Sequence, residues 1–317
     1  MKSKLPLVLL ILFSVSCNHG SKAPIGEAHW DDGPRVGSLD LLGVSFADDL
    51  TGLIVGDISP AGEGGAIYKT ADGGRTWRAI AHTPEILTSV CLLDAKRAWV
   101  AGYGGRIERT DDGGQTWKTQ RTERDGEMLN SIFFIDDRHG WAAGGSGLLL
   151  RTSNGGDSWE PVSTRRVEDL WAVRFSSADA GWAVGEDGLI LRSSDGGRTW
   201  APQTSSTNKA LMGLTVSADG VAVAVGASGT VLINEAGEQW RPVEAPTTES
   251  LNAVSSGKTR NLWVVGSRGV VIGSTDSGRT WAKANNISGD LASVDESRAG
   301  RGIAVGKQGT TRLLPAQ

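Results

Sequence analysis

The chain has 317 residues, of which 39% are hydrophobic and 21% are charged. This composition excludes a disordered chain, because it holds enough apolar residues to build a packed core. The net charge of −4, without a long run of either sign, excludes general binding to nucleic acid, which requires a basic face.

The N-terminal residues are typical of a bacterial export signal. Lys2 and Lys4 precede an apolar run over 6–15 that is too short to span a bilayer. The run ends in SVSC at 14–17, which resembles the lipoprotein signal in which the Cys is lipidated, although Leu is commoner at the first of these positions. The pattern predicts an exported protein of the cell envelope.

We therefore expect a signal peptide at 1–16, a tether at 17–25 that is lipid-anchored through Cys17, and one folded domain at 26–317. The alternative is an ordinary cleaved signal peptide in which Cys17 is incidental.

A unit of about 40 residues recurs seven times from residue 41 onward. Each unit has an apolar residue three places after its first Leu and a Gly fifteen places after it. The seven Leu–Gly pairs are Leu41–Gly56, Leu87–Gly102, Leu129–Gly144, Leu170–Gly185, Leu211–Gly226, Leu251–Gly266 and Leu291–Gly306.

Each unit contains four short β-rich runs separated by Gly, Asp and Ser turns. In the fourth unit these runs are LWAVRF, GWAVG, LILRS and TWAPQ. Four-stranded units of this length are typical of propeller blades, so the fold class is all-β, a seven-bladed β-propeller. Cys91 is predicted to be a small core residue, and so are the second-strand tryptophans, Trp99, Trp141, Trp182 and Trp263.

The seventh unit lacks its fourth run, because only eight residues follow Gly309. In the other six units a Trp stands shortly before the next Leu, and Trp30 stands at the same spacing before Leu41. Residues around 26–36 are therefore expected to supply the missing outer strand. This closure would remove an exposed strand edge.

The turn before the fourth run has the pattern S/T-x-D-x-G-x-T-W. Its Asp suits an Asx turn, its Gly permits positive φ, and its Trp is expected to begin the outer strand and pack over the blade. Since five copies cannot form one active site, we interpret the motif as structural. Its members are Asp72, Trp77, Asp112, Trp117, Asn154, Trp159, Asp195, Trp200, Asp276 and Trp281.

These turns resemble the Asp-boxes (BNR repeats) of bacterial sialidases, sorting-receptor ectodomains and photosystem II assembly/stability factors. The whole unit, with GWAVG at 181–185 before SSDGGRTW at 193–200, is most similar to the last family, over 26–317. The resemblance implies a seven-bladed propeller, lipid-anchored in some members, that acts as a non-catalytic assembly factor. Relatives also occur in bacteria without photosynthesis.

The resemblance further implies that the partners are membrane or envelope protein subunits and that no cofactor is needed. The expected location is the bacterial cell envelope, facing the periplasm or cell surface, or the lumenal side in a photosynthetic organism.

The residues give little support to the interpretation of the chain as an enzyme. A sialidase needs a Tyr nucleophile among several other groups, and the chain has two tyrosines and four scattered histidines. We interpret the chain as not an enzyme. Two alternatives stay open: an Asp-box glycoside hydrolase, because propeller sites combine residues of distant blades, and a carbohydrate-binding surface lipoprotein with a glycan partner.

The segments that cross between blades are the expected binding surface. Two adjacent crossings, RTERDGEM at 121–128 and STRRVED at 163–169, carry the candidate protein-binding residues, Arg121, Arg124, Arg165 and Arg166. Arginine binds carboxylates bidentately, and solvated charge is the alternative. Trp171 lies outside both tryptophan series, and core packing is favoured over a position facing the axis.

Overall fold

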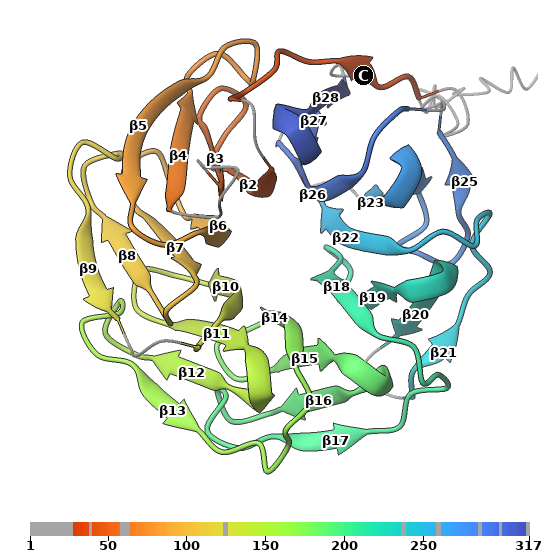
Figure 1. The fold of residues 1–317 in the computed structure, drawn as a ribbon. Coiled ribbons are helices and arrows are strands. Elements are labelled where there is room, and N and C mark those ends of the chain that lie inside the picture. The colour runs from red at the N-terminus through yellow and green to blue at the C-terminus, as the bar shows by residue number, and fades with distance from the viewer. Residues whose placement is uncertain are drawn as a thin grey trace, which may run out of the picture.

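The computed structural model describes residues 28–37, 40–57, 64–122, 126–235, 239–257, 261–284, 287–297 and 300–314. Within them, seven four-stranded sheets stand around a central axis (Figure 1), which confirms the predicted seven-bladed β-propeller. The predicted signal peptide, tether and Cys17 lie outside the described residues. No helix in these ranges is long and apolar enough to cross a membrane.

The repeat Leu begins the innermost strand of every blade. These seven strands are β2 (Leu41–Phe46), β6 (Leu87–Leu92), β10 (Leu129–Phe134), β14 (Leu170–Phe175), β18 (Leu211–Val216), β22 (Leu251–Ser256) and β26 (Leu291–Glu296). The second strands are β3 (Gly52–Asp57), β7 (Ala98–Gly102), β11 (Gly140–Gly144), β15 (Gly181–Gly185), β19 (Ala222–Gly226), β23 (Leu262–Gly266) and β27 (Gly302–Gly306). We number the blades 1 to 7 in this order.

The third and fourth strands form the outer half of each blade. The third strands are β4 (Gly65–Thr70), β8 (Ile107–Thr110), β12 (Leu149–Thr152), β16 (Ile190–Ser193), β20 (Thr230–Asn234), β24 (Val271–Ser274) and β28 (Thr311–Leu314). The outer strands are β5 (Arg78–Thr83), β9 (Lys118–Arg121), β13 (Glu160–Val162), β17 (Ala201–Gln203), β21 (Arg241–Pro242), β25 (Ala282–Lys283) and β1 (Asp31–Asp32). Each outer strand begins just after the motif Trp, whereas the sequence predicted that it begins at the Trp.

The repeated Leu and Gly lie opposite each other in the two inner strands. Leu170 pairs with Gly185, and a Cβ atom at Gly185 would lie 2.2 Å from the carbonyl oxygen of Asp169. At the six equivalent glycines this distance is also between 2.0 and 2.2 Å. The backbones therefore approach too closely for any side chain, which explains the Gly at this place in every blade.

The seventh sheet joins the two ends of the described chain. β1 pairs antiparallel with β28, with Asp31 opposite Leu313 and Asp32 opposite Arg312. Trp30 is 2% exposed and packs edge-on against Trp263 of blade 6, at a ring-centroid distance of 5.4 Å. A strand from the N-terminal side thus covers the edge that β28 would otherwise expose.

The second-strand tryptophans lie in the core between blades, as predicted, with exposures of 0–4%. Trp99 of blade 2 stacks on Phe134 of blade 3 at 3.7 Å, and its Nε1 donates to the carbonyl oxygen of Gly155 at 3.0 Å. Trp141 repeats this arrangement one blade later, with Phe175 and Gly196. These side chains therefore fasten one blade to the next.

Candidate functional site

The Asp-box of blade 4 shows how the motif is used. Asp195 Oδ1 accepts hydrogen bonds from the Ser193 hydroxyl and the Thr199 N–H, both at 2.9 Å. Asp195 Oδ2 accepts one from the Thr199 hydroxyl at 2.6 Å, and Trp200 Nε1 donates to the carbonyl oxygen of Gly197 at 3.2 Å. Every one of these bonds closes the turn between β16 and β17.

The bond from the backbone N–H four places later recurs at the other predicted boxes, which are Asp72, Asp112, Asn154 and Asp276. Hydrogen bonds from the Thr199 hydroxyl, the Thr199 N–H and the Ser193 hydroxyl lower the pKa of Asp195 from 3.8 to about 2. Burial opposes this shift but does not cancel it. The motif tryptophans are half-buried beside their turns: Trp77, Trp117, Trp159, Trp200 and Trp281. We propose that the boxes are joints of the scaffold.

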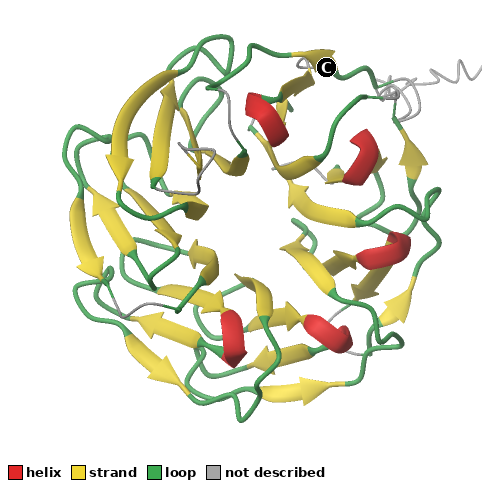
Figure 2. Cartoon of the chain, in the orientation of Figure 1, coloured by secondary structure: helices red, strands yellow, loops and turns green. Residues whose placement is uncertain are grey.

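The crossings between blades lie on the face opposite the Asp-boxes. They share it with the turns between second and third strands, where Figure 2 shows short helices: η2 (Gly145–Gly147), η3 (Glu186–Gly188), η4 (Ala227–Gly229), η5 (Ser267–Gly269) and η6 (Lys307–Gly309). In the crossing from blade 3 to blade 4, the Thr164 hydroxyl donates to Gly147 O at 3.1 Å. Asp169 Oδ1 accepts the N–H of Ser146 at 2.7 Å, so both ends of this crossing are held.

The four arginines predicted to bind a protein do not form one exposed surface. Arg121 has a side chain only 13% exposed, and its Nη1 lies 2.9 Å from both Gly105 O and Glu127 Oε2. It therefore ties a loop together and is not part of an exposed surface. Arg124 lies outside the described residues.

Arg165 and Arg166 stand at the tip of the crossing between blades 3 and 4, and both are exposed. Arg166 Nη2 donates to Glu168 Oε1 at 2.5 Å, which neutralises its charge locally. Arg165 forms no ion pair with any described residue. Val167 beside them is 82% exposed, more than any other large hydrophobic residue in the described ranges. We call Arg165, Arg166 and Val167 the crossing tip.

The backbone of the crossing tip is strained. Arg165 has φ of +55°, in the left-handed region that disfavours side chains other than Gly. Crossings elsewhere place Gly in this region, as at Gly126 and Gly289. Five exposed non-Gly residues in the turns after the second strands share this conformation, and Arg165 is the one non-Gly residue among the described crossings that adopts it.

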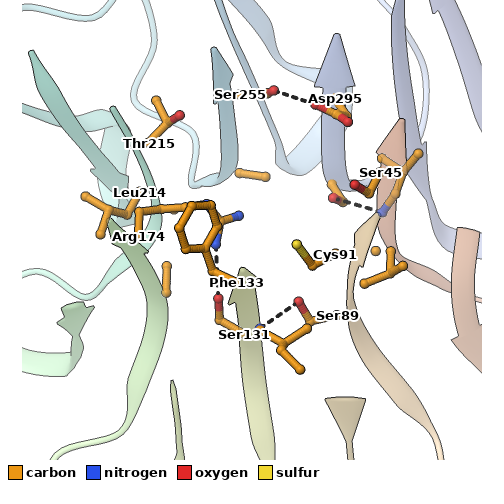
Figure 3. A pocket seen from close by; sticks show the side chains of 18 of the residues that line it. Ser45, Ser89, Cys91, Ser131, Phe133, Arg174, Leu214, Thr215, Ser255 and Asp295 are labelled. Carbon is orange, nitrogen blue, oxygen red and sulfur yellow. Dashed lines mark hydrogen bonds between the residues drawn. The ribbon is translucent and has the colours of Figure 1, made fainter. Parts of the chain in front are cut away.

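The inner strands enclose a channel of about 410 Å³ that is lined from all seven blades (Figure 3). Trp171 and Cys91 line this channel and are half-buried. The expectation of core packing is wrong for Trp171, whereas Cys91 also packs against the core between blades 2 and 3. The pairing register shifts between Leu170 and Ala172, and this bulge takes Trp171 out of the strand alternation. Cys91 Sγ accepts the N–H of Phe134 at 3.3 Å, and burial raises the pKa of its thiol.

Comparison with known proteins identifies the repeats. The sequence model of the family described as photosynthesis system II assembly factor YCF48 matches residues 80–167, which run from blade 1 through blades 2 and 3 to the crossing tip. Residues 80–167 are thus similar to the photosystem II assembly factor-like family. The chain's predicted resemblance to this family is confirmed. No curated protein matches the sequence.

Solved structures share the fold. A structure titled "YCF48 bound to D1 peptide" is 19% identical, with a TM-score of 0.72, covering 91% of this chain and 97% of that one. YCF48 from Cyanidioschyzon merolae is also 19% identical, with a TM-score of 0.70 and coverages of 90% and 99%. A streptogramin B lyase is 12% identical, with a TM-score of 0.77 and coverages of 93% and 100%.

Replacement of Asp195 tests the structural role of the boxes. Asp195→Ala should lower the free energy of unfolding at neutral pH by about 1–3 kcal/mol, because the turn donors lose their acceptor. Asp195→Asn should cost much less, since Asn154 already fills this place with bonds to Ser158 at 2.9 and 3.0 Å. Urea unfolding measures both values.

The pH dependence gives a second readout. Because the folded pKa of Asp195 is lowered, its stabilisation is complete above about pH 4 and is lost as the pH falls towards 2. Asp195→Asn should therefore lose less stability than the wild type across this window. Equal acid sensitivity of the two proteins, or a large cost of Asn at neutral pH, would contradict the assignment.

Proposed function

We propose that the chain is a non-catalytic, protein-binding propeller of the bacterial cell envelope, which assists the assembly of a membrane complex. Its partner binds at the crossing tip, with an apolar side chain against Val167 and a carboxylate at Arg165. The partner segment is therefore acidic and partly apolar.

The observation that carries this proposal is the combination found at Arg165. Its charge is exposed and unmatched among the described residues, its backbone is held at φ of +55°, and the most exposed hydrophobic side chain lies two places away. Folding alone does not favour the exposed charge or the exposed hydrophobic side chain. Arginine and a neighbouring apolar side chain are, in contrast, common anchors of protein interfaces.

The family resemblance supports a protein partner. The matched family is described as an assembly factor, and one similar structure is titled as bound to a peptide. The matched residues end at Val167, so they include the crossing tip. This supports the interpretation of the chain as an assembly factor and not as a glycoside hydrolase.

We further propose that residues 1–16 are a cleaved signal peptide and that 17–25 tether the propeller to a membrane through a lipidated Cys17. The sequence pattern around Cys17 supports this proposal. A tether of nine residues would keep the crossing face close to partners in the same membrane.

A photo-crosslinking residue at position 167 tests the partner site directly. We expect position 167 to form an adduct with a membrane or envelope protein in cells, identified by mass spectrometry. Leu50 is the matched control, because it is also an exposed hydrophobic residue, at 51%, but lies in the turn between β2 and β3 on the opposite face.

Arg165→Gly provides the second control. Gly relieves the left-handed strain, so this variant should be as stable as the wild type, while the adduct at position 167 should be strongly reduced. Adducts that form equally at positions 50 and 167, or that do not change with Arg165→Gly, would rule out the crossing tip as the partner site.

Cys17→Ser tests the anchor. A bacterial lipoprotein carries at least two acyl chains, each methylene of which contributes about 0.8 kcal/mol to membrane binding, so the wild type should resist high-salt washing and leave only with detergent. Cys17→Ser should lack the acyl mass, whereas Cys91→Ser should keep it. A mature wild-type N-terminus without acyl mass at Cys17 would exclude the anchor.

A further inference from the structure

The fourth residue after each repeat Leu forms a ring around the channel. We call it the channel ring; its members are Ser45, Cys91, Phe133, Arg174, Thr215, Ser255 and Asp295. Most of them join their blade to the following one. Ser45 Oγ accepts the N–H of Leu92 at 3.1 Å, and Asp295 Oδ2 accepts the N–H of Phe46 at 2.7 Å across the closure of the ring.

Two members of the channel ring depart from this pattern. Among the described residues, Phe133 and Arg174 make no hydrogen bond to the following blade, whereas Cys91, Thr215 and Ser255 each make one. Phe133 and Arg174 instead lie against each other, with the guanidinium carbon 5.4 Å from the ring centroid (Figure 3). No other blade carries a cation or an aromatic ring at this place.

Arg174 keeps one edge of its guanidinium available. Nη1 donates to Val173 O at 2.8 Å and to Ser131 Oγ at 3.3 Å, which fixes the side chain. Nε and Nη2 have no hydrogen-bond partner among the described residues. These two atoms form the edge that binds a carboxylate bidentately, and Arg174 is the one cationic side chain among the described residues of the channel lining.

Hydroxyl groups of the channel lining have protons to donate. The hydroxyl oxygens of Ser45 and Ser89 accept backbone N–H groups, so the proton of each hydroxyl remains to be donated. Asp295 faces the same cavity, but its carboxylate already accepts from Phe46, Ser255 and Glu296. Such a lining suits a ligand that brings acceptor oxygens.

The apolar side chains beside Arg174 decide which anion fits. A carboxylate with an apolar body contacts both the guanidinium edge and these side chains, whereas inorganic phosphate contacts only the edge. A monocarboxylate is therefore favoured over phosphate. A volume of about 410 Å³ is in the range of small-molecule sites, and Phe133, Trp171 and Met212 offer apolar surface to the body of such a ligand.

We propose that the central channel binds a small monocarboxylate, whose carboxylate group meets Nε and Nη2 of Arg174 and whose apolar body lies among Phe133, Trp171 and Met212. This site lies in the channel lining and not at the crossing tip, so it is independent of the proposed partner site.

Calorimetric titration of the purified full chain with benzoate tests the proposal. Benzoate should bind saturably, while benzamide, its neutral counterpart of the same shape, and inorganic phosphate should bind much more weakly. Arg174→Gln should weaken benzoate binding by about ten- to a hundred-fold, the usual effect of losing hydrogen bonds to a charged group. Arg165→Gly should leave benzoate binding unchanged.

Melting curves of both variants confirm that they are folded before binding is compared. The proposal is overturned if benzoate does not saturate, if benzamide or phosphate binds as well as benzoate, or if folded Arg174→Gln binds benzoate as tightly as the wild type. Failure of the crosslinking at position 167 would leave these results unaffected, so the two proposals fail separately.

Discussion

The architecture depends on how the innermost strands satisfy their free edges. Each blade is a separate sheet, so the backbone ladder stops at its inner strand and the N–H groups there need other acceptors. Side chains of the preceding blade supply them: Ser89 Oγ accepts from Ile132 and Ser131 Oγ accepts from Val173. The closed ring removes the open edges that an incomplete ring would leave.

This constraint distinguishes two kinds of residue: those that join neighbouring blades, and those whose place in the repeat does not serve this purpose. The Leu–Gly pairs, the buried tryptophans and the Asp-boxes repeat because every blade needs the same joints. Arg165, Phe133 and Arg174 do not repeat, and among the described residues the side chains of Phe133 and Arg174 make no hydrogen bond to the following blade. Arg165 is held in a left-handed conformation at the surface, and Nε and Nη2 of Arg174 have no hydrogen-bond partner among the described residues. Both proposals rest on departures from the repeat.

The fold could be predicted because its joints depend on sequence offsets. The Gly fifteen places after each Leu reflects one backbone contact, and Trp30 marks a strand through a spacing shared by six other blades. The sites could not be predicted in the same way. Trp171 lines the channel because of a bulge, which the alternation of apolar and polar residues does not reveal. Arg121 is held away from the exposed surface by its bonds to Gly105 and Glu127. The signal for Arg174 was a cation at a position where no other blade carries one.

The division between residues that join blades and those that do not can be measured directly by urea unfolding without ligand. The double variant Ser45→Ala/Ser89→Ala leaves the N–H groups of Leu92 and Ile132 without acceptors, at an expected cost of about 1–3 kcal/mol for each. Arg174→Gln removes no acceptor from the following blade and should cost less than about 1 kcal/mol. An equal or larger loss for Arg174→Gln would show that Arg174 holds the ring and would contradict this account.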